Sequence, residues 1–407
     1  MSALVAAATL KIDVAPVYRQ WGWIAVGPYA IATVIAAVLA LRRRSPTVRA
    51  RVGLAVAVFV GATLVPLSME IAWRDRGPRP DSHSNSEPII TEEAARALVH
   101  GRNPYATAFL EGPLAAWPIG TKTHYPYLPA MLLFGLPRAA ADSVATDARA
   151  AFLAGTLALL AVSLRRWKAT DQHRLLVCQV LVVLPTGALL LSGGGDDLPV
   201  VAMMLLSLVL LDEGLTGWAA ATAGAAAAMK QLAWPFVPLL VSTAWKDRGR
   251  GQGMRASITA ATVVAGIVAP FVLWNPGAFF DDVVRFPLGY GKPKTFHPTP
   301  TPGVLFVRAF PGARGAMAAL VAILLLGLLG YVTVRRRPAR PGGPSPGADV
   351  ARDTALVLLV AILLAPSSRI GFFIYPINLL VWARSMAGVP RRTLVASGEE
   401  RPAGRPA

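Results

Sequence analysis

The sequence predicts an all-α protein, a polytopic bundle of about 11 transmembrane helices with a long outer loop that carries interfacial helices. Two observations support this. The 407 residues are 54% hydrophobic and only 15% charged, whereas about one quarter of the residues of a soluble domain are charged. Apolar runs also alternate with short basic blocks along the chain. Together these features exclude an ordinary soluble enzyme.

The apolar runs give the order of the predicted spans. The segment 216–245 must cross an even number of times between Glu213 and the basic block at Lys246, so it is expected to be a hairpin of two short helices with Met229-Lys230-Gln231 near its tip. Two short runs, 355–365 and 371–382, flank Pro366. The clearest spans are 23–41, 52–73, 148–166, 175–191, 198–211, 256–274 and 316–334.

The distribution of charge predicts the sidedness. Basic residues gather in short connections, which lie in the cytoplasm by the positive-inside rule, so the net charge of +18 indicates a membrane protein and not a nucleic-acid partner. The N-terminus is then outside and the C-terminus inside. The whole chain is predicted to be one integral domain of the cell membrane. Its acidic loops 74–147 and 275–302 are extracytoplasmic, and the Pro- and Gly-rich stretches 338–350 and 390–407 form a flexible cytoplasmic loop and tail.

The loop 74–147 is too long for a simple connection and is expected to be functional. Within it, Thr91 is the predicted N-cap of a helix that has Glu92 and Glu93 in its first turn and ends at Gly101. The short run 126–137 is predicted to lie along the outer membrane surface.

Several motifs resemble glycosyltransferase family 87, the polyprenol-phosphate-mannose-dependent mannosyltransferases of the GT-C superfamily. The likeness begins with Ala-Arg-Ala-Leu-Val-His-Gly-Arg-Asn-Pro-Tyr at 95–105 and His-Tyr-Pro-Tyr-Leu-Pro at 124–129. It continues at 192–198, 228–231 and 366–369. The resemblance implies an inverting enzyme that moves mannose from a polyprenyl phosphate to a glycolipid or lipoglycan at the outer face of the membrane.

The family places a catalytic carboxylate shortly before the loop helix, and an ungapped count back from Gly101 puts Glu87 there. The chain departs from the family pattern at Pro88-Ile89-Ile90, so Asp81 competes for the role. Transfer needs one base to take the proton from the attacking hydroxyl. Without the resemblance, either carboxylate is most simply a solvated loop residue.

Substrate-binding candidates follow the same motifs. Lys230 and Arg369 stand where apolar segments meet the outside and can hold a departing phosphate, although the first could simply snorkel and the second could be an interfacial anchor. Asp196 and Asp197 can bind sugar hydroxyls. A lone loop histidine is more often only polar than a ligand. The remaining candidates are His124, Tyr125, Gln231 and His297.

No cofactor is expected. The five histidines have no close ligand spacing, which argues against zinc, and one cysteine, Cys178, cannot form a disulfide within the chain.

Other functions remain open. A transporter or flippase of lipid-linked sugars would carry charges in the middle of several helices, whereas here they gather near helix ends. A non-catalytic assembly protein would tolerate alanine at both candidate carboxylates. A GT-C enzyme with another sugar donor, or with a protein as acceptor, fits the motifs equally well.

Overall fold

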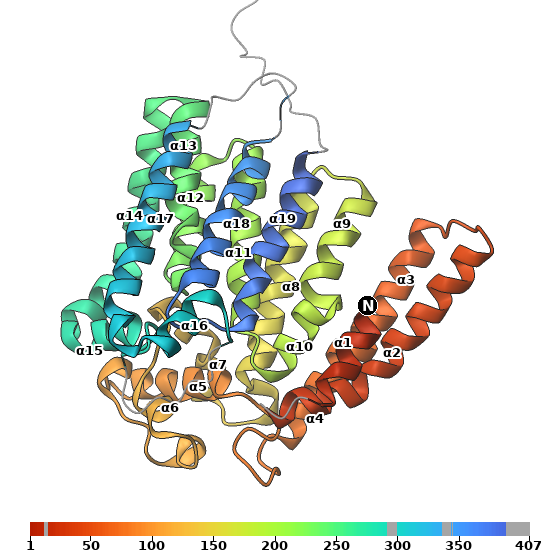
Figure 1. Ribbon diagram of the computed structural model, residues 1–407, viewed down its shortest axis with the longest axis horizontal. Coiled ribbons are helices and arrows are strands. Elements are labelled where there is room, and N and C mark those ends of the chain that lie inside the picture. The colour runs from red at the N-terminus through yellow and green to blue at the C-terminus, as the bar shows by residue number, and fades with distance from the viewer. Residues whose placement is uncertain (12–14, 291–298, 336–342, 344, 388–407) are drawn as a thin grey trace, which may run out of the picture.

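The computed structural model describes residues 1–11, 15–290, 299–335, 343 and 345–387, and every regular element among them is helical. The predicted all-α class is therefore confirmed. Most of the helices run side by side in one bundle, while short helices cover one of its ends (Figure 1). A two-helix arm, α2 (Pro16–Leu41) with α3 (Val48–Phe59), leans away from the bundle.

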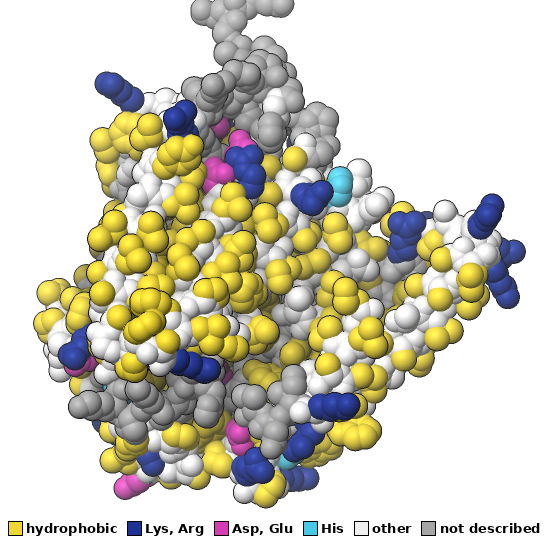
Figure 2. Space-filling model, viewed as in Figure 1, with side chains coloured by type: hydrophobic (Ala, Val, Ile, Leu, Met, Phe, Trp, Pro, Cys, Tyr) yellow, Lys and Arg dark blue, Asp and Glu magenta, His cyan; other side chains and the backbone are white. Residues whose placement is uncertain are grey.

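In the described part of the chain, seven helical segments are long and apolar enough to cross a membrane: Pro16–Leu41, Val48–Trp73, Ala148–Arg166, Asp171–Gly193, Arg250–Trp274, Pro311–Arg335 and Ile370–Ala387. Four others run alongside them, namely α11 (Asp197–Asp212), α12 (Thr216–Ala227), α13 (Phe236–Arg248) and α18 (Pro346–Leu364). The chain is thus a membrane protein, and the count of 11 crossings stays a prediction. Apolar side chains cover the visible face of the bundle (Figure 2), and Leu273, Leu326 and Ile323 are each more than 60% exposed.

The two kinds of loop lie at opposite ends of the bundle. The turn between α2 and α3 (Val48–Phe59), which carries Arg42 to Arg44, and the turn between α13 and α14 (Arg250–Trp274) are at the upper end in Figure 1. The first long loop and α15 (Pro276–Phe280) are at the lower end. Which of the two ends faces the cytoplasm stays a prediction from the charge pattern.

Helix α11 is the central helix of the bundle, because every residue from Leu198 to Leu211 except Met203 is buried. Its first residue, Asp197, therefore stands at a fixed point on the lower end. The helix starts after Gly195, whose φ of 90° is in the left-handed region that glycine adopts without strain. Two acidic residues are thus fixed at the start of a buried helix.

The loop helix begins earlier than predicted. Helix α5 spans Ser86–Val99 with Asn85 as N-cap, so the assignment of Thr91 as N-cap is wrong. Thr91 is inside the helix, and its hydroxyl donates to the Glu87 carbonyl at 2.8 Å. Pro88 is tolerated because the N–H groups of a first helical turn have no helical acceptor. The predicted end is correct, since Gly101 has a φ of 71°. Glu87 consequently belongs to the first turn of a helix and not to a loop.

The remaining predicted segments divide between described and undescribed residues. Ser345 caps α18 by accepting from the Ala348 N–H at 3.0 Å, so residues 346–350 are helical and not a flexible loop. The second outer loop, 275–302, contains α15 and a short π-helix at Asp281–Arg285, and it ends where α16 (Pro302–Ala309) begins. The tail 390–407 lies outside the described residues.

Candidate active site

Glu87 and Arg369 form an ion pair across 282 residues of sequence, in which the Arg369 Nη1 donates to Glu87 Oε1. Glu87 stands in the first turn of α5, and Arg369 precedes the span that contains α19 (Ile374–Ala387). The side chains are 15% and 38% exposed, respectively, so the pair is sheltered but reachable. The other carboxylate oxygen, Glu87 Oε2, is buried and has no hydrogen-bond partner in the described part of the chain.

Lys230 forms a second charged group with both acidic residues at the start of α11. Its Nζ lies 2.7 Å from Asp196 Oδ2 and 2.6 Å from Asp197 Oδ1. Tyr375 donates its hydroxyl to Asp197 Oδ1 at 2.8 Å. The ammonium is also 5.3 Å from the ring centre of Tyr127, within cation–π range. Lys230 is only 7% exposed, so this cation is held firmly by its partners.

The turn that ends in Lys230 is fixed by the segment of Tyr127. Backbone N–H groups of Leu128 and Ala130 donate to the carbonyls of Met229 and Ala228 at 3.1 and 3.0 Å. These two backbone hydrogen bonds fix the segment of Tyr127 relative to the turn before Lys230, which holds the Tyr127 ring beside the Lys230 ammonium.

The two charged groups belong to one site, because the glycine turn 193–195 lies between them. A Cβ on Gly194 would be 3.4 Å from Glu87 Oε2, and a Cβ on Gly193 would clash with Asn85 Nδ2 at 2.9 Å. The Asn85 N–H donates to the Gly193 carbonyl at 2.8 Å. Only glycine allows the start of α5 to approach the acidic pair so closely.

Tyr127 is the second link between the groups. Burial raises the pKa of its phenol well above the ordinary value, and the nearby carboxylates of Asp196 and Glu87 raise it further. The Tyr127 phenol therefore stays protonated and uncharged beside the carboxylates of Asp196 and Glu87.

The family model of glycosyltransferase family 87 matches residues 125–366, more than half of the chain. The chain belongs to glycosyltransferase family 87. A comparison with curated proteins finds no match.

The match to family 87 covers part of the site. Tyr127, the acidic pair at 196–197 and Lys230 lie within the matched residues, while Glu87 lies 38 residues before their start at 125 and Arg369 lies three residues after their end at 366. Membership therefore supports glycosyltransferase activity for the chain, and the roles of the flanking ion pair depend on the geometry alone.

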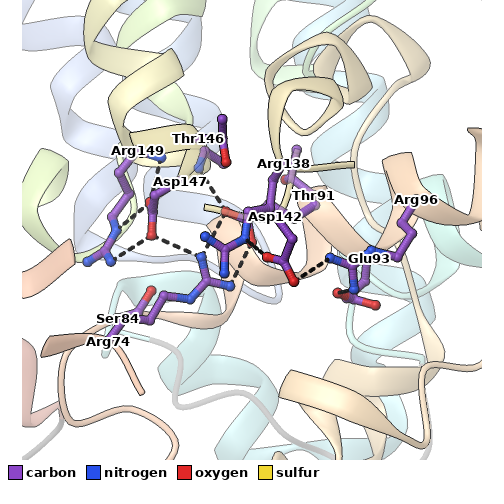
Figure 3. A network of polar contacts seen from close by, with 12 residues as sticks. Arg74, Ser84, Thr91, Glu93, Arg96, Arg138, Asp142, Thr146, Asp147 and Arg149 are labelled. Atoms are coloured by element: carbon purple, nitrogen blue, oxygen red, sulfur yellow. Dashed lines mark hydrogen bonds and ion pairs between the residues drawn. The ribbon is translucent and has the colours of Figure 1, made fainter. Parts of the chain in front are cut away.

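A second charge network holds α5 in place (Figure 3). Arg74 donates to Glu92 through Nη2 at 2.6 Å and to Asp147 through Nη1 at 2.9 Å. Arg149, which is fully buried, contacts Asp147 Oδ1 through Nε at 3.0 Å. Its guanidinium also donates to the Ser192 carbonyl at 3.0 Å, one residue before the glycine turn. The network thus connects α5 and α8 (Ala148–Arg166) to the backbone of the site.

The paired arginines decide the protonation of Asp147. Burial alone would raise its pKa, but the guanidinium groups of Arg149 and Arg74 outweigh burial and lower the pKa to about 2. This carboxylate is charged throughout the physiological range and acts as a fixed structural anion.

Five of the predicted site residues come together in the structure: Glu87, Asp196, Asp197, Lys230 and Arg369. The competing candidate, Asp81, lies in the turn before α5 and makes no ion pair or side-chain hydrogen bond with any described residue. Its position therefore gives it no visible connection to the charged groups.

Three predicted residues have contacts of another kind. His124 stacks on Phe286 with ring centres 4.4 Å apart and contacts only its own turn through Nδ1. Tyr125 is fully buried, and its N–H donates to Asp282 Oδ2 at 2.8 Å. Gln231 Nε2 donates to the carbonyls of Pro126 and Val283 at 3.0 and 2.9 Å, which joins the two outer loops. The remaining candidate, His297, lies outside the described residues.

The structure also adds residues that the sequence did not indicate. Tyr18 accepts from Asn85 Nδ2 at 2.6 Å, and Phe372 places its ring 5.8 Å from the Lys230 ammonium. Of the added residues only Tyr127 carried a signal, since it belongs to the matching motif at 124–129. Within the described residues, no group of three or more His, Cys, Asp or Glu side chains could hold a metal ion.

Proposed function

We propose that the chain is an inverting glycosyltransferase that moves a hexose, mannose, from a polyprenyl monophosphate to a glycolipid or lipoglycan. The active site would lie at the extracytoplasmic face of the cell membrane. The observation that carries the proposal is the ion pair of Glu87 with Arg369 beside the Lys230 group, in which the buried Glu87 Oε2 has no hydrogen-bond partner among the described residues.

In the proposed reaction, the acceptor hydroxyl attacks the anomeric carbon as the bond from that carbon to the phosphate oxygen breaks. Glu87 Oε2 takes the hydroxyl proton, and the phosphate leaves with the bonding electron pair. One carboxylate is sufficient, because phosphate is a good leaving group. Attack from the face opposite the phosphate inverts the configuration of the sugar.

Arg369 is the cation best placed to hold the leaving phosphate. Its guanidinium has five N–H donors, and the side chain is 38% exposed. Lys230 is less suited to direct contact because it is 7% exposed and already holds two carboxylates. It would instead keep Asp196 and Asp197 in place to accept hydrogen bonds from the sugar hydroxyls.

The proposal is tested by transfer from radiolabelled polyprenyl-phosphate-mannose to a lipid extract with the protein in nanodiscs. Glu87→Gln keeps the volume and removes the base, so we expect transfer to fall by about 10² to 10⁴-fold. Asp81→Asn is the matched control and should retain the wild-type rate. EDTA should have no effect on either protein.

Three outcomes would contradict the proposal or part of it. Loss of transfer only in Asp81→Asn would move the base, and equal rates in all three proteins would remove both carboxylates from the chemistry. A folded wild-type protein that transfers nothing from an intact donor would count against the mannose donor, and other lipid-linked sugars would then be tried in the same assay.

A further inference from the structure

The loop segment that contains Thr299 is bonded on both sides of Arg369. The Thr299 N–H donates to the Ser368 carbonyl at 2.9 Å. The Thr299 hydroxyl accepts from the Ile370 N–H at 2.8 Å. Thr299, in the second outer loop, thus forms hydrogen bonds with the backbone immediately before and after Arg369.

Thr299 itself is held at the base of α16. The Thr301 N–H donates to the Thr299 carbonyl at 2.7 Å, and Thr301 is the N-cap residue of that helix. Helix α16 packs against the end of α18, since a Cβ on Gly303 would lie 2.1 Å from the Leu364 carbonyl oxygen. This close approach ties Thr299 to the chain that leads into Arg369.

The segment of Arg369 has few other regular supports. It lies between the end of α18 at Leu364 and the 3-10 turn Ile370–Phe373, and the preceding Ser368 is fully buried with a hydroxyl that finds no partner among the described residues. The Arg369 carbonyl accepts from the Phe372 N–H at 3.1 Å, the first bond of that 3-10 turn, which constrains the backbone on the C-terminal side. The two bonds from Thr299 add a constraint on both sides of the arginine.

We propose that Thr299 is a positioning residue that aims the Arg369 guanidinium at Glu87 and at the phosphate of the donor. The role rests on the proposed function, because Arg369 is the phosphate-binding cation in it. Thr299 does not contact the reacting atoms. It acts by fixing the backbone from which Arg369 projects, and small displacements of a charged group cost catalytic rate steeply.

The test compares two threonines of the same segment. Thr299→Val removes the acceptor for the Ile370 N–H and keeps the volume. Thr301→Val removes a buried hydroxyl that has no described partner. Thr299→Ser restores the hydroxyl. We expect kcat/KM for the polyprenyl-phosphate donor to fall about tenfold in Thr299→Val, mainly through KM, and to stay at the wild-type value in the other two.

Two further measurements separate positioning from general damage. In an Arg369→Gln background, Thr299→Val should have no additional effect on KM, because its effect passes through the arginine. Hydrogen–deuterium exchange of peptides covering 368–373 should rise in Thr299→Val only, and this readout does not depend on activity.

Equal kinetics and equal exchange for Thr299→Val and Thr301→Val would overturn the role of Thr299. Faster exchange with unchanged transfer would overturn it as well, since the backbone would then loosen without moving the arginine. Transfer lost in the wild type would instead refute the proposed function, and exchange would still report whether Thr299 holds the segment.

Discussion

Two sets of buried charges lie at the same end of the molecule and differ in how fully their atoms are partnered. In the Arg74–Glu92–Asp147–Arg149 network, both carboxylates receive several donors from guanidinium groups and backbone N–H groups (Figure 3). In the Glu87–Arg369 pair, one carboxylate oxygen is buried without a described partner, and the arginine is 38% exposed. A saturated network can only hold structure, whereas an unsaturated pair can still bind and accept a proton.

The contrast explains why the two sets are adjacent. Arg149 donates to the backbone of Ser192, next to the glycine turn that approaches Glu87. The rigid network therefore sets the position of the reactive pair, as a supporting shell does for other polar sites. Variants in the network should change stability, and variants in the pair should change transfer.

The largest predicted effect is on stability, in Asp147→Asn. Loss of the carboxylate charge leaves the buried guanidinium groups of Arg149 and Arg74 without their anion, so we expect the free energy of unfolding to fall by about 3–5 kcal/mol. Thermal unfolding in nanodiscs measures this. The matched control is Asp142→Asn, in an exposed part of the same network, which should cost no more than about 1 kcal/mol.

The same carboxylate predicts a dependence on pH. Because its folded-state pKa is about 2, below the ordinary carboxyl value, Asp147 contributes stability at all pH values above that ordinary value. The contribution is lost as the pH falls toward 2. An Asp147→Asn protein that matched the wild type at pH 7 would show that the network is not a scaffold.

A smaller effect, on transfer alone, is predicted for Arg369→Lys. The charge remains, but the planar fork that can hold a phosphate and Glu87 together is lost, so donor KM should rise about tenfold with little change in melting temperature. Steady-state kinetics with the polyprenyl-phosphate donor measure it. Arg285→Lys, at an exposed pair with Asp281, is the control and should behave as wild type. A fall in stability without a change in KM would place Arg369 with the scaffold.

Sequence patterns predicted the local features of this site better than its contacts. Hydrophobic runs and caps depend on neighbouring residues, so the spans and the end of α5 at Gly101 could be predicted. The beginning of α5 could not, because Thr91 is a good N-cap in sequence and Pro88 hides the first turn. Family motifs singled out Glu87 and Arg369 separately. Their pairing spans 282 residues and depends on how the bundle folds, which no local pattern contains.

The charge network escaped prediction for the same reason. Arg74, Glu92 and Asp147 resemble ordinary loop residues along the chain, and only burial makes them partners. Thr299 is an equally plain residue until the backbone of Arg369 is placed beside it. Conversely, Asp81 and His124 belong to polar stretches that looked functional, yet the Asp81 side chain has no partner among the described residues, and His124 stacks on Phe286 and hydrogen-bonds only within its own turn.

The smallest predicted effect concerns Asp282, a buried carboxyl with the opposite titration behaviour to Asp147. Burial raises its pKa to about 8, because only the Tyr125 N–H compensates and the Asp281 charge adds to the rise. The folded state therefore holds its proton more tightly than the unfolded chain does. Its stabilising contribution is complete below the ordinary carboxyl pKa and is lost as the pH rises toward 8.

Asp282→Asn should remove this loss of stability at high pH, because an amide does not titrate in this range. The amide oxygen of the new side chain can still accept from the Tyr125 N–H. We expect the variant to equal the wild type in stability near pH 4 and to be more stable than it at pH 8, by at least about 1 kcal/mol. Thermal unfolding across this range measures the difference, and Asp142→Asn, at an exposed carboxylate that does not act on Asp282, should give a curve parallel to the wild type. Because Asp147 has guanidinium partners and Asp282 has only one backbone donor, opposite pH trends in the two asparagine variants would show that partners, and not burial, decide which carboxylates stabilise this end of the bundle.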